Sequence, residues 1–308
     1  GTNTVFGIVD RRGDIVRRGG FSTKAFENKP LEEYIDKFVE SLNDLIDQVD
    51  GAKNIKGIGV GAPNGNYYTG CIEFAPNLPW KGVIPLAQIL TDRLNIPAAL
   101  TNDANAAAVG EMTYGVARGI KDFIVITLGT GVGSGIVVNG QLVYGHDGFA
   151  GELGHTTIIK DGRVCGCGKK GCLETYSSAT GVARTAREYL ERNNDPSILR
   201  SFKPEEITSK HVHDAALQGD VMAKEIFEYT GRLLGEAFAD FVAFSSPEAI
   251  ILFGGLTKSG KYIYNPIRKH MEQNLLPIFR NKIRILFSDL KDADAAILGS
   301  SALAWELP

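Results

Sequence analysis

The residues with the clearest chemical potential are one histidine and three cysteines close together in the sequence. His155 is followed by Cys165, Cys167 and Cys172, with glycines between the cysteines. One imidazole and three thiolates form a closed set of four ligands that suits tetrahedral Zn²⁺. Because all four positions are filled by the protein, no position is left for a catalytic water, and we expect a structural zinc. The alternative, a loop of reduced thiols, is disfavoured by the glycine-flanked Cys-x-Cys spacing.

Two glutamates flank this cluster. Glu152 lies three residues before His155, and Glu174 lies two residues after Cys172. A metal bound by the cluster would hold both carboxylates near one place. Paired carboxylates and an imidazole suit the hydroxyl groups of a sugar, which predicts a sugar site beside the metal. The alternative for each glutamate is an exposed surface charge.

A second candidate site is the glycine-rich segment 129–135. Its residues Gly129, Thr130, Gly131 and Gly133 lie between two predicted strands. Glycines let the backbone approach a ligand closely and direct N–H groups at an anion. The segment lacks the Gly-Lys-Ser/Thr ending of the Walker A motif. It therefore predicts a phosphate contact of another type, with a flexible β-turn as the alternative.

A candidate base follows the predicted strand 96–100. Asn102 and Asp103 stand between this strand and the Ala-rich helix predicted over 104–114, at the end of an α/β sheet strand where ligands usually bind. A carboxylate in this position suits the proton acceptor of a phosphoryl transfer to a hydroxyl group. The alternative is that Asp103 only caps the helix.

Two weaker signals complete the set. Gly254 and Gly255 follow the predicted strand 249–253, where a nucleotide could lie against bare backbone. A simple turn explains this pair almost as well. Asn77, in the stretch Ala-Pro-Asn-Leu-Pro-Trp, could reach a ligand, although an asparagine before Leu-Pro is also common in loops.

The elements that position these residues alternate between strands and helices, which predicts an α/β fold. Strands are predicted by short apolar runs, and helices by apolar residues at steps of three and four. The predicted strands cover 55–60, 96–100, 122–128, 249–253 and 283–287. The predicted helices cover 31–49, 85–94, 104–114, 220–244, 261–276 and 293–305.

The chain also contains an internal repeat. Residues 1–9 and 129–137 both place Gly-Thr before a Gly-Ile-Val strand and a glycine-containing turn. This pattern predicts two related halves, each with a β-hairpin near a phosphate. The second hairpin is preceded by the strand 122–128, and a half without such a strand would leave a sheet edge open. We therefore expect a strand of about ten residues ahead of Gly1.

Composition narrows the functional class. The 308 residues carry a net charge of −3, and no Lys/Arg run predicts a nucleic-acid partner. This length predicts about two domains. No run approaches the roughly 20 apolar residues of a membrane span, so no membrane partner is expected. Three of the four cysteines are clustered, which favours metal binding in a reducing compartment and predicts a cytoplasmic protein.

Together these residues resemble the ROK family (repressors, open reading frames and sugar kinases) of the actin-like ATPase and sugar kinase superfamily. Its most specific motifs here are GELGH at 151–155 and CGCGKKGCLE at 165–174. The resemblance implies two actin-like (ribonuclease H-like) lobes with a ligand cleft between them. We expect a small lobe over 1–115, completed by the C-terminal helix at 293–308, and a large lobe over 116–292.

The resemblance also implies roles for single residues. Asp103 would be the catalytic base, and Mg²⁺ would accompany ATP. The sugar would be held by Asn77, Asn102, Asp103, Glu152, His155 and Glu174, and zinc by His155, Cys165, Cys167 and Cys172. The phosphates would meet Gly1, Thr2, Gly129, Thr130, Gly131 and Gly133, and the adenosine Gly254 and Gly255. The first phosphate segment of the family reads Asp-x-Gly-Gly-Thr, and the sequence starts at its last glycine.

Within the family, the Ala-Pro-Asn-Leu-Pro-Trp stretch and the Glu-x-Gly-His pair are most like those of glucokinases. The resemblance to the family also implies the use of ATP and a dimer or tetramer. Kinases for N-acetylmannosamine and N-acetylglucosamine share most of the same residues and stay open as alternatives. Repressor members begin with a helix-turn-helix, whereas residues 1–20 here form the kinase hairpin, so no DNA binding is expected. The rivals from other classes are a sugar-binding sensor without catalysis and a bare zinc-binding module.

Overall fold

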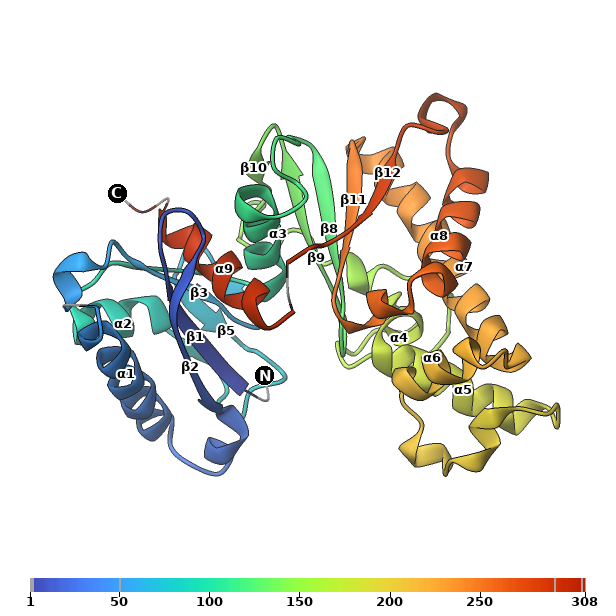
Figure 1. The fold of residues 1–308 in the computed structure, drawn as a ribbon, viewed down its shortest axis with the longest axis horizontal. Helices are drawn as coiled ribbons and strands as arrows, with labels where there is room; N and C mark the ends of the chain where they lie inside the picture. The colour runs from blue at the N-terminus through green and yellow to red at the C-terminus, as the bar shows by residue number, and fades with distance from the viewer. Residues whose placement is uncertain (1–2, 50, 291, 306, 308) are drawn as a thin grey trace. The chain divides into compact units, whose positions relative to one another are not determined.

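The computed structural model describes residues 3–49, 51–290, 292–305 and 307 (Figure 1). Strands and helices alternate along them, which confirms the predicted α/β class. The strands are β1 (Asn3–Val9), β2 (Ile15–Ser22), β3 (Ile58–Gly61), β4 (Gly65–Asn66), β5 (Cys71–Glu73), β6 (Val83–Ile84), β7 (Ala98–Thr101), β8 (Phe123–Leu128), β9 (Val132–Val138), β10 (Gln141–Leu142), β11 (Ala249–Phe253) and β12 (Arg284–Phe287). No helix among these residues is both long enough and apolar enough to cross a membrane.

The helices follow the predicted ranges closely. They are α1 (Leu31–Asp47), α2 (Leu86–Leu94), α3 (Asp103–Tyr114), α4 (Glu174–Ser177), α5 (Ala179–Arg192), α6 (Ser209–Leu217), α7 (Val221–Ser245), α8 (Lys261–Asn274) and α9 (Asp292–Trp305). α4, α5 and α6 were not predicted. The buried positions of α5 and α6 are held largely by alanine, glycine, threonine and single valines, which are weaker apolar signals than leucine, isoleucine or phenylalanine.

The chain forms two compact units. Unit 1 contains residues 1–119, 135–150 and 289–308, and unit 2 contains residues 120–134 and 151–288. The segment 135–150 therefore groups with unit 1, whereas the large lobe expected from the sequence runs unbroken over 116–292. Its packing explains this grouping, because a Cβ atom at Gly135 would lie 2.7 Å from the Cβ of Ala108 on α3.

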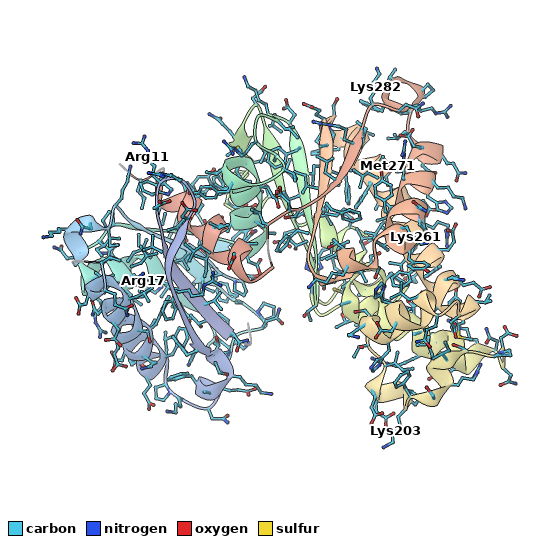
Figure 2. The ribbon with its side chains drawn as sticks, in the orientation of Figure 1. Arg11, Arg17, Lys203, Lys261, Met271 and Lys282 are labelled. Carbon is cyan, nitrogen blue, oxygen red and sulfur yellow. The ribbon has the colours of Figure 1, made fainter. Side chains whose placement is uncertain are left out.

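Unit 2 is organised around the buried strand β8. β11 runs parallel to both β8 and β12, and β9 begins in unit 2 and continues into the segment 135–150. β8 is rich in β-branched side chains and is buried almost throughout, as expected for a parallel strand with both faces covered. α7 packs against α8, where Met271 (labelled in Figure 2) is fully buried. Glycine on α7 permits this approach, since a Cβ at Gly235 would lie 2.6 Å from the Ile267 carbonyl oxygen.

Unit 1 contains separate small sheets. β1 pairs antiparallel with β2, and β3 pairs parallel with β7. α1 carries the predicted apolar face, and its Phe38 contacts the rings of Phe6 and Phe21 from the hairpin. α9 packs against α3 and β3, so the end of the chain belongs to the same core as its beginning.

The contact between β3 and α9 requires a residue without a side chain, Gly59. A Cβ atom at Gly59 would clash with the main-chain carbonyl oxygen of Ser300. Backbone cannot move aside as a flexible side chain can, and overpacking of this kind costs about 1–3 kcal/mol.

We therefore expect Gly59→Ala to lower the free energy of unfolding by about 2–3 kcal/mol. The control is Gly255→Ala, because a Cβ at Gly255 would meet no heavy atom within 4 Å. Urea denaturation of both variants measures the difference. Equal urea midpoints for the two variants would contradict the close packing of α9 against Gly59.

Candidate functional site

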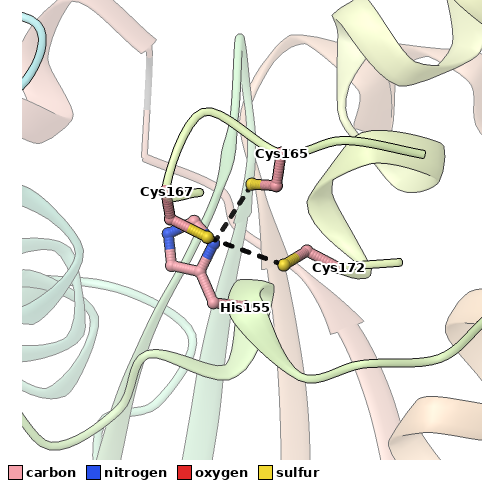
Figure 3. Close-up of side chains that lie close together, drawn as sticks. All are labelled: His155, Cys165, Cys167 and Cys172. Atoms are coloured by element: carbon pink, nitrogen blue, oxygen red, sulfur yellow. Dashed lines mark hydrogen bonds between the residues drawn. The ribbon is translucent and has the colours of Figure 1, made fainter. Parts of the chain in front are cut away.

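The histidine and the three cysteines converge in unit 2 (Figure 3). One ligand atom from each of His155, Cys165, Cys167 and Cys172 lies within 4.8 Å of every other. The Cys165 sulfur is 3.6 Å from Nδ1 of His155, and the sulfurs of Cys167 and Cys172 are 3.7 Å apart. Sulfurs bound tetrahedrally to one zinc at about 2.3 Å would lie at about this separation. The group is therefore compatible with a structural zinc.

The thiols differ in acidity. Burial raises the pKa of the Cys165 thiol to about 12 and also raises the pKa of Cys172. For Cys167, burial acts in the same direction, but a hydrogen bond from the backbone of Lys169 helps to outweigh it and the pKa is lowered. Two of the three sulfurs thus resist ionisation without a cation, so a bound divalent metal would supply the charge that stabilises them as thiolates.

The other ring nitrogen of His155 faces Glu152. Nε2 lies 3.8 Å from Oε2 of Glu152, while Nδ1 faces the sulfurs. Glu152 is exposed and His155 is half-buried. A histidine that binds metal through one nitrogen commonly places the other against a carboxylate. His155 thus connects the cysteine cluster with an accessible carboxylate, in the arrangement expected of a residue with two functions.

Glu174 connects the cluster with the glycine-rich segment. Its Oε1 accepts a hydrogen bond from the Cys165 thiol at 3.6 Å, and its Oε2 accepts one from the Val132 N–H at 3.0 Å. A Cβ atom at Gly131 would clash with Oε2 of the same carboxylate. The glycine is therefore required for this contact. Glu174 holds the turn between β8 and β9 against the cysteine loop.

The two predicted nucleotide segments are neighbours within unit 2. β8 and β11 are paired in parallel, so Gly129 and Gly254 follow strands that end at the same edge of the sheet. Gly254 has a φ of +105°, and a Cβ there would lie 2.8 Å from the Leu128 carbonyl oxygen. Gly129 and Gly255 face open space, since a Cβ atom at either would meet no heavy atom within 4 Å. Bare backbone is therefore accessible at both segments.

Several supporting residues were not predicted from the sequence. The Ser134 hydroxyl donates to the Gly151 carbonyl and accepts from the Leu153 N–H, which ties the GELGH segment to β9. The Thr180 hydroxyl donates to the Thr130 carbonyl oxygen at 2.8 Å. Hydroxyl side chains such as these give no signal in sequence, because their partners are backbone groups that become neighbours only on folding.

Arg163 is the other unpredicted support. Its guanidinium is buried, lies 2.7 Å from a carboxylate oxygen of Glu188 and donates to the Thr175 carbonyl oxygen. It also stacks over the ring of Tyr176 at 4.3 Å. Since α4 begins at Glu174, Arg163 holds the helix that positions this carboxylate.

In unit 1, Asn102 and Asp103 have different roles at the start of α3. The Asn102 side chain is buried and accepts the helix-capping hydrogen bond from the Asn105 N–H at 2.6 Å. Asp103 is the first helical residue and is exposed. One of its oxygens accepts from the Ala104 N–H at 2.9 Å. The residue that caps α3 is therefore Asn102 and not Asp103. Asp103 presents a solvent-accessible carboxylate at the carboxyl end of β7.

Asn77 lies in the connection between β5 and β6 of unit 1, and its side chain is exposed. The ammonium group of Lys81 donates to the carbonyl oxygens of Pro76 and Leu78, and the Trp80 indole donates to the Lys29 carbonyl oxygen. These bonds hold the loop in place around Asn77.

The structure thus gathers the predicted residues into two groups. Asn77, Asn102 and Asp103 belong to unit 1, and the predicted metal ligands, Glu152, Glu174 and the glycine segments at 129–133 and 254–255 belong to unit 2. Within unit 2, the contacts above connect Glu152, His155, Glu174 and the first glycine segment. The predicted phosphate residues Gly1 and Thr2 lie outside the described residues.

Comparison with known proteins gives one consistent family. The model of the ROK family matches residues 1–306. A glucokinase of Thermotoga maritima is 32% identical over 308 residues, which cover 99% of this chain and 95% of that protein. A xylose repressor of Caldicellulosiruptor bescii is 30% identical over 284 residues, 90% of this chain and 71% of the repressor. The crystal structure of a ROK family glucokinase from Streptomyces griseus, in complex with glucose and AMPPNP, has a TM-score of 0.82 at 32% identity and covers 99% of this chain and 97% of its own.

We expect the three clustered thiols of metal-free protein to react with iodoacetamide in a fixed order. Cys167 should be alkylated first at neutral pH, because it is exposed and its lowered pKa increases the thiolate fraction, which is the reactive form. Cys165 and Cys172 are buried with raised pKa values and should react far more slowly. Peptide mass spectrometry over a time course measures the order, and equal rates at the three positions would contradict the geometry.

Proposed function

Since the chain belongs to the ROK family and has the two-lobe α/β fold of the sugar kinases within it, we propose that it is an ATP-dependent hexose kinase with glucose as its substrate. The proposal draws on glucokinase relatives that match almost the whole chain. The solved relative from Streptomyces griseus holds glucose and AMPPNP, an ATP analogue. The single observation that carries the proposal is the exposed carboxylate of Asp103, which Asn102 releases from capping.

Asp103 is the proposed general base. A hexose hydroxyl becomes a nucleophile only as it loses its proton, and a carboxylate within hydrogen-bonding reach can accept that proton in the transition state. In the balanced reaction, the hydroxyl oxygen forms a bond to the γ-phosphorus and the bond from that phosphorus to the β–γ bridging oxygen breaks. The hydroxyl proton goes to Asp103, the phosphoryl group stays on the sugar, and ADP leaves.

The hexose hydroxyls would be held by side chains of complementary polarity. The proposed set comprises Asn77, Asn102, Glu152, His155 and Glu174. Glu152 and Nε2 of His155 are the best placed of the unit 2 members, since the carboxylate is exposed and faces the imidazole. Glu174 has both oxygens engaged in the protein, so we assign it first to positioning the glycine turn.

The phosphates of ATP would lie against the glycine segments. Gly129, Thr130, Gly131 and Gly133 supply N–H groups at a turn, and Gly254 and Gly255 leave backbone bare at the adjoining strand end. Such backbone donors suit the oxygens of a transferring phosphoryl group. Mg²⁺, bound together with ATP, would neutralise the negative charge of the phosphates.

Zinc would act on structure alone. His155, Cys165, Cys167 and Cys172 fit it by donor type and separation. When bound, it would supply the positive charge that keeps the thiols ionised. Its ligand His155 would be oriented toward Glu152 and the sugar. Its ligand Cys165 would hold Glu174, and through Glu174 the glycine turn.

A sugar-binding sensor without phosphoryl transfer is the second candidate, and the xylose-repressor relatives favour it. Its sugar site would use the same residues, but it would have no use for an accessible base. The kinase and the sensor therefore differ at Asp103. Kinases for N-acetylmannosamine differ from a glucokinase only in the hexose that is accepted.

We expect Asp103→Asn to lower kcat by about 10²–10⁴-fold, the usual contribution of a positioned general base, with little change in the KM for glucose. The matched control is Asp92→Asn on α2, whose exposed carboxylate accepts a hydrogen bond from the Gln88 side chain and belongs to neither site. ADP release with Mg-ATP and glucose, mannose, fructose, N-acetylglucosamine or N-acetylmannosamine measures the rates. Sugar binding without turnover by the unsubstituted protein would replace the kinase with the sensor.

For the metal, we expect one zinc per chain by elemental analysis and a cobalt-substituted protein with the absorption of a tetrahedral thiolate complex. Cys172→Ser should reduce the zinc content and expose the cysteine loop to proteolysis. Cys71→Ser is the control, because Cys71 lies in β5 of unit 1 and outside the cluster. Full zinc content in Cys172→Ser would exclude this ligand set.

A further inference from the structure

Unit 1 contains a cluster of three tyrosines to which the proposed function gives no role. Tyr67 and Tyr68 lie in the turn between β4 and β5, and Tyr144 follows β10. The rings of Tyr67 and Tyr144 are stacked, with centroids 4.2 Å apart and planes inclined by 9°. The ring of Tyr68 meets both of them at an angle, at 6.0 Å from Tyr67 and 5.9 Å from Tyr144. Aromatic contacts thus join two segments of unit 1 that are distant in the sequence.

The ring of Tyr68 is both fixed and exposed. Its hydroxyl donates to the Gly145 carbonyl oxygen at 2.9 Å, and its backbone N–H donates to Oδ1 of Asn66 at 3.0 Å. Tyr68 is nevertheless 58% exposed. Fixing an exposed side chain costs conformational entropy that folding does not need to spend. A large ring that is held in one orientation and left open to solvent has the properties of a preorganised contact for a ligand.

Asn66 fixes the tyrosine turn to the segment that follows β10. Its side chain is buried, and its Nδ2 donates to the Asp147 carbonyl oxygen at 2.8 Å. Gly148 has a φ of +91°, and a Cβ atom there would clash with Oδ1 of Asn66. The two segments are therefore packed too closely to shift independently, and the fold sets the orientation of Tyr68.

The tyrosine turn starts beside the strand that leads to the proposed base. The Ala62 N–H donates to the Thr101 carbonyl oxygen at 3.0 Å, and a Cβ atom at Gly65 would clash with the same oxygen. Thr101 ends β7, two residues before Asp103. Three residues of extended chain span at most about 11 Å, which limits the distance from Gly65 to the backbone of Tyr68. The ring therefore lies in the neighbourhood of Asp103.

The chemistry of the cluster suits a sugar ring. The face of an aromatic ring is electron-rich, whereas a pyranose presents C–H groups on its faces and hydroxyl groups around its rim. His146 and Asp147, which follow Gly145, are exposed and offer polar groups for rim hydroxyls. The adenine ring is also flat, but the proposed nucleotide segments 129–133 and 254–255 belong to unit 2. The ligand with a matching face in unit 1 is therefore the hexose.

We propose that Tyr68 is a sugar-binding residue whose ring stacks on one face of the hexose, and that Tyr67 and Tyr144 brace it. The identity of the ligand rests on the proposed function. The ring takes no part in the transfer of the proton or the phosphoryl group, so it stabilises the bound sugar and the transition state equally. Loss of such uniform binding raises KM and leaves kcat unchanged.

The test measures sugar binding and turnover separately. Isothermal titration calorimetry without ATP gives the Kd for glucose and the four other sugars named above, and ADP release with Mg-ATP gives kcat and KM. Both are measured for Tyr68→Ala, Tyr68→Phe and the unsubstituted protein. The control is Phe244→Ala, because Phe244 is 85% exposed near the end of α7 in unit 2.

We expect Tyr68→Ala to raise the Kd and KM for the hexose by about 2–10-fold, the range of one aromatic contact, with kcat unchanged. Tyr68→Phe keeps the ring and loses the bond to Gly145, so it should bind sugar nearly as well as the unsubstituted protein. Equal weakening by both substitutions would assign the effect to the loop and overturn the stacking. Weaker binding of ATP in place of sugar would assign the ring to adenine and would also overturn it.

The inference and the proposed function can fail separately. Sugar binding without turnover, weakened by Tyr68→Ala, would remove the kinase and support the stacking. Normal turnover with an unchanged Kd in Tyr68→Ala would remove the stacking and keep the kinase. Absence of binding for all five sugars would overturn both.

A fluorescent substitution gives an independent check. Tyr68→Trp keeps a flat ring at the exposed position, so addition of the hexose should change the emission beyond any change in the unsubstituted protein. Phe244→Trp is the control and should show no added change. Emission of Tyr68→Trp that the bound hexose leaves unaltered would contradict the stacking. This readout needs no catalytic activity, and it decides alone if Tyr68→Ala does not fold.

Discussion

The candidate site of unit 2 depends on one carboxylate. Glu174 accepts a hydrogen bond from Cys165 with one oxygen and from the Val132 N–H with the other. The cysteine loop and the glycine turn are far apart in the sequence, so this bridge sets their relative position. Arg163, buried behind α4, keeps the carboxylate in place. A change at the cysteine cluster would therefore also reach the glycine turn.

The ends of parallel strands provide the second constraint. β7, β8 and β11 each run into a polar or glycine-rich segment, which leaves backbone donors or a carboxylate accessible at the strand ends. At the end of β7, the accessibility of the carboxylate depends on which residue caps α3. Because Asn102 satisfies the first turn of α3, the carboxylate of Asp103 has a single backbone hydrogen bond and remains exposed. A capping aspartate would have been poorly available as a base.

Burial distinguishes the strands of the different sheets. β8 is buried at all but one position, and most of β9 is buried. No residue of β1 or β3 is fully buried. The tripeptide Gly-Ile-Val, which recurs at 7–9 and 135–137, therefore stands in strands of different burial.

The sequence by itself determined the α/β class, the long helices and the buried strands, because apolar periodicity depends only on local order. It also identified four residues that the structure brings together, His155, Cys165, Cys167 and Cys172. The tertiary structure alone decided which residue caps α3, since Asn102 and Asp103 are both good capping residues. It alone showed that Glu174 bonds the glycine turn, and that Ser134, Thr180 and Arg163 support it, because each of these bonds joins backbone or side chains brought together by folding. α5 and α6 escaped prediction because their buried positions are mostly small residues, which give a weaker apolar signal than leucine, isoleucine or phenylalanine.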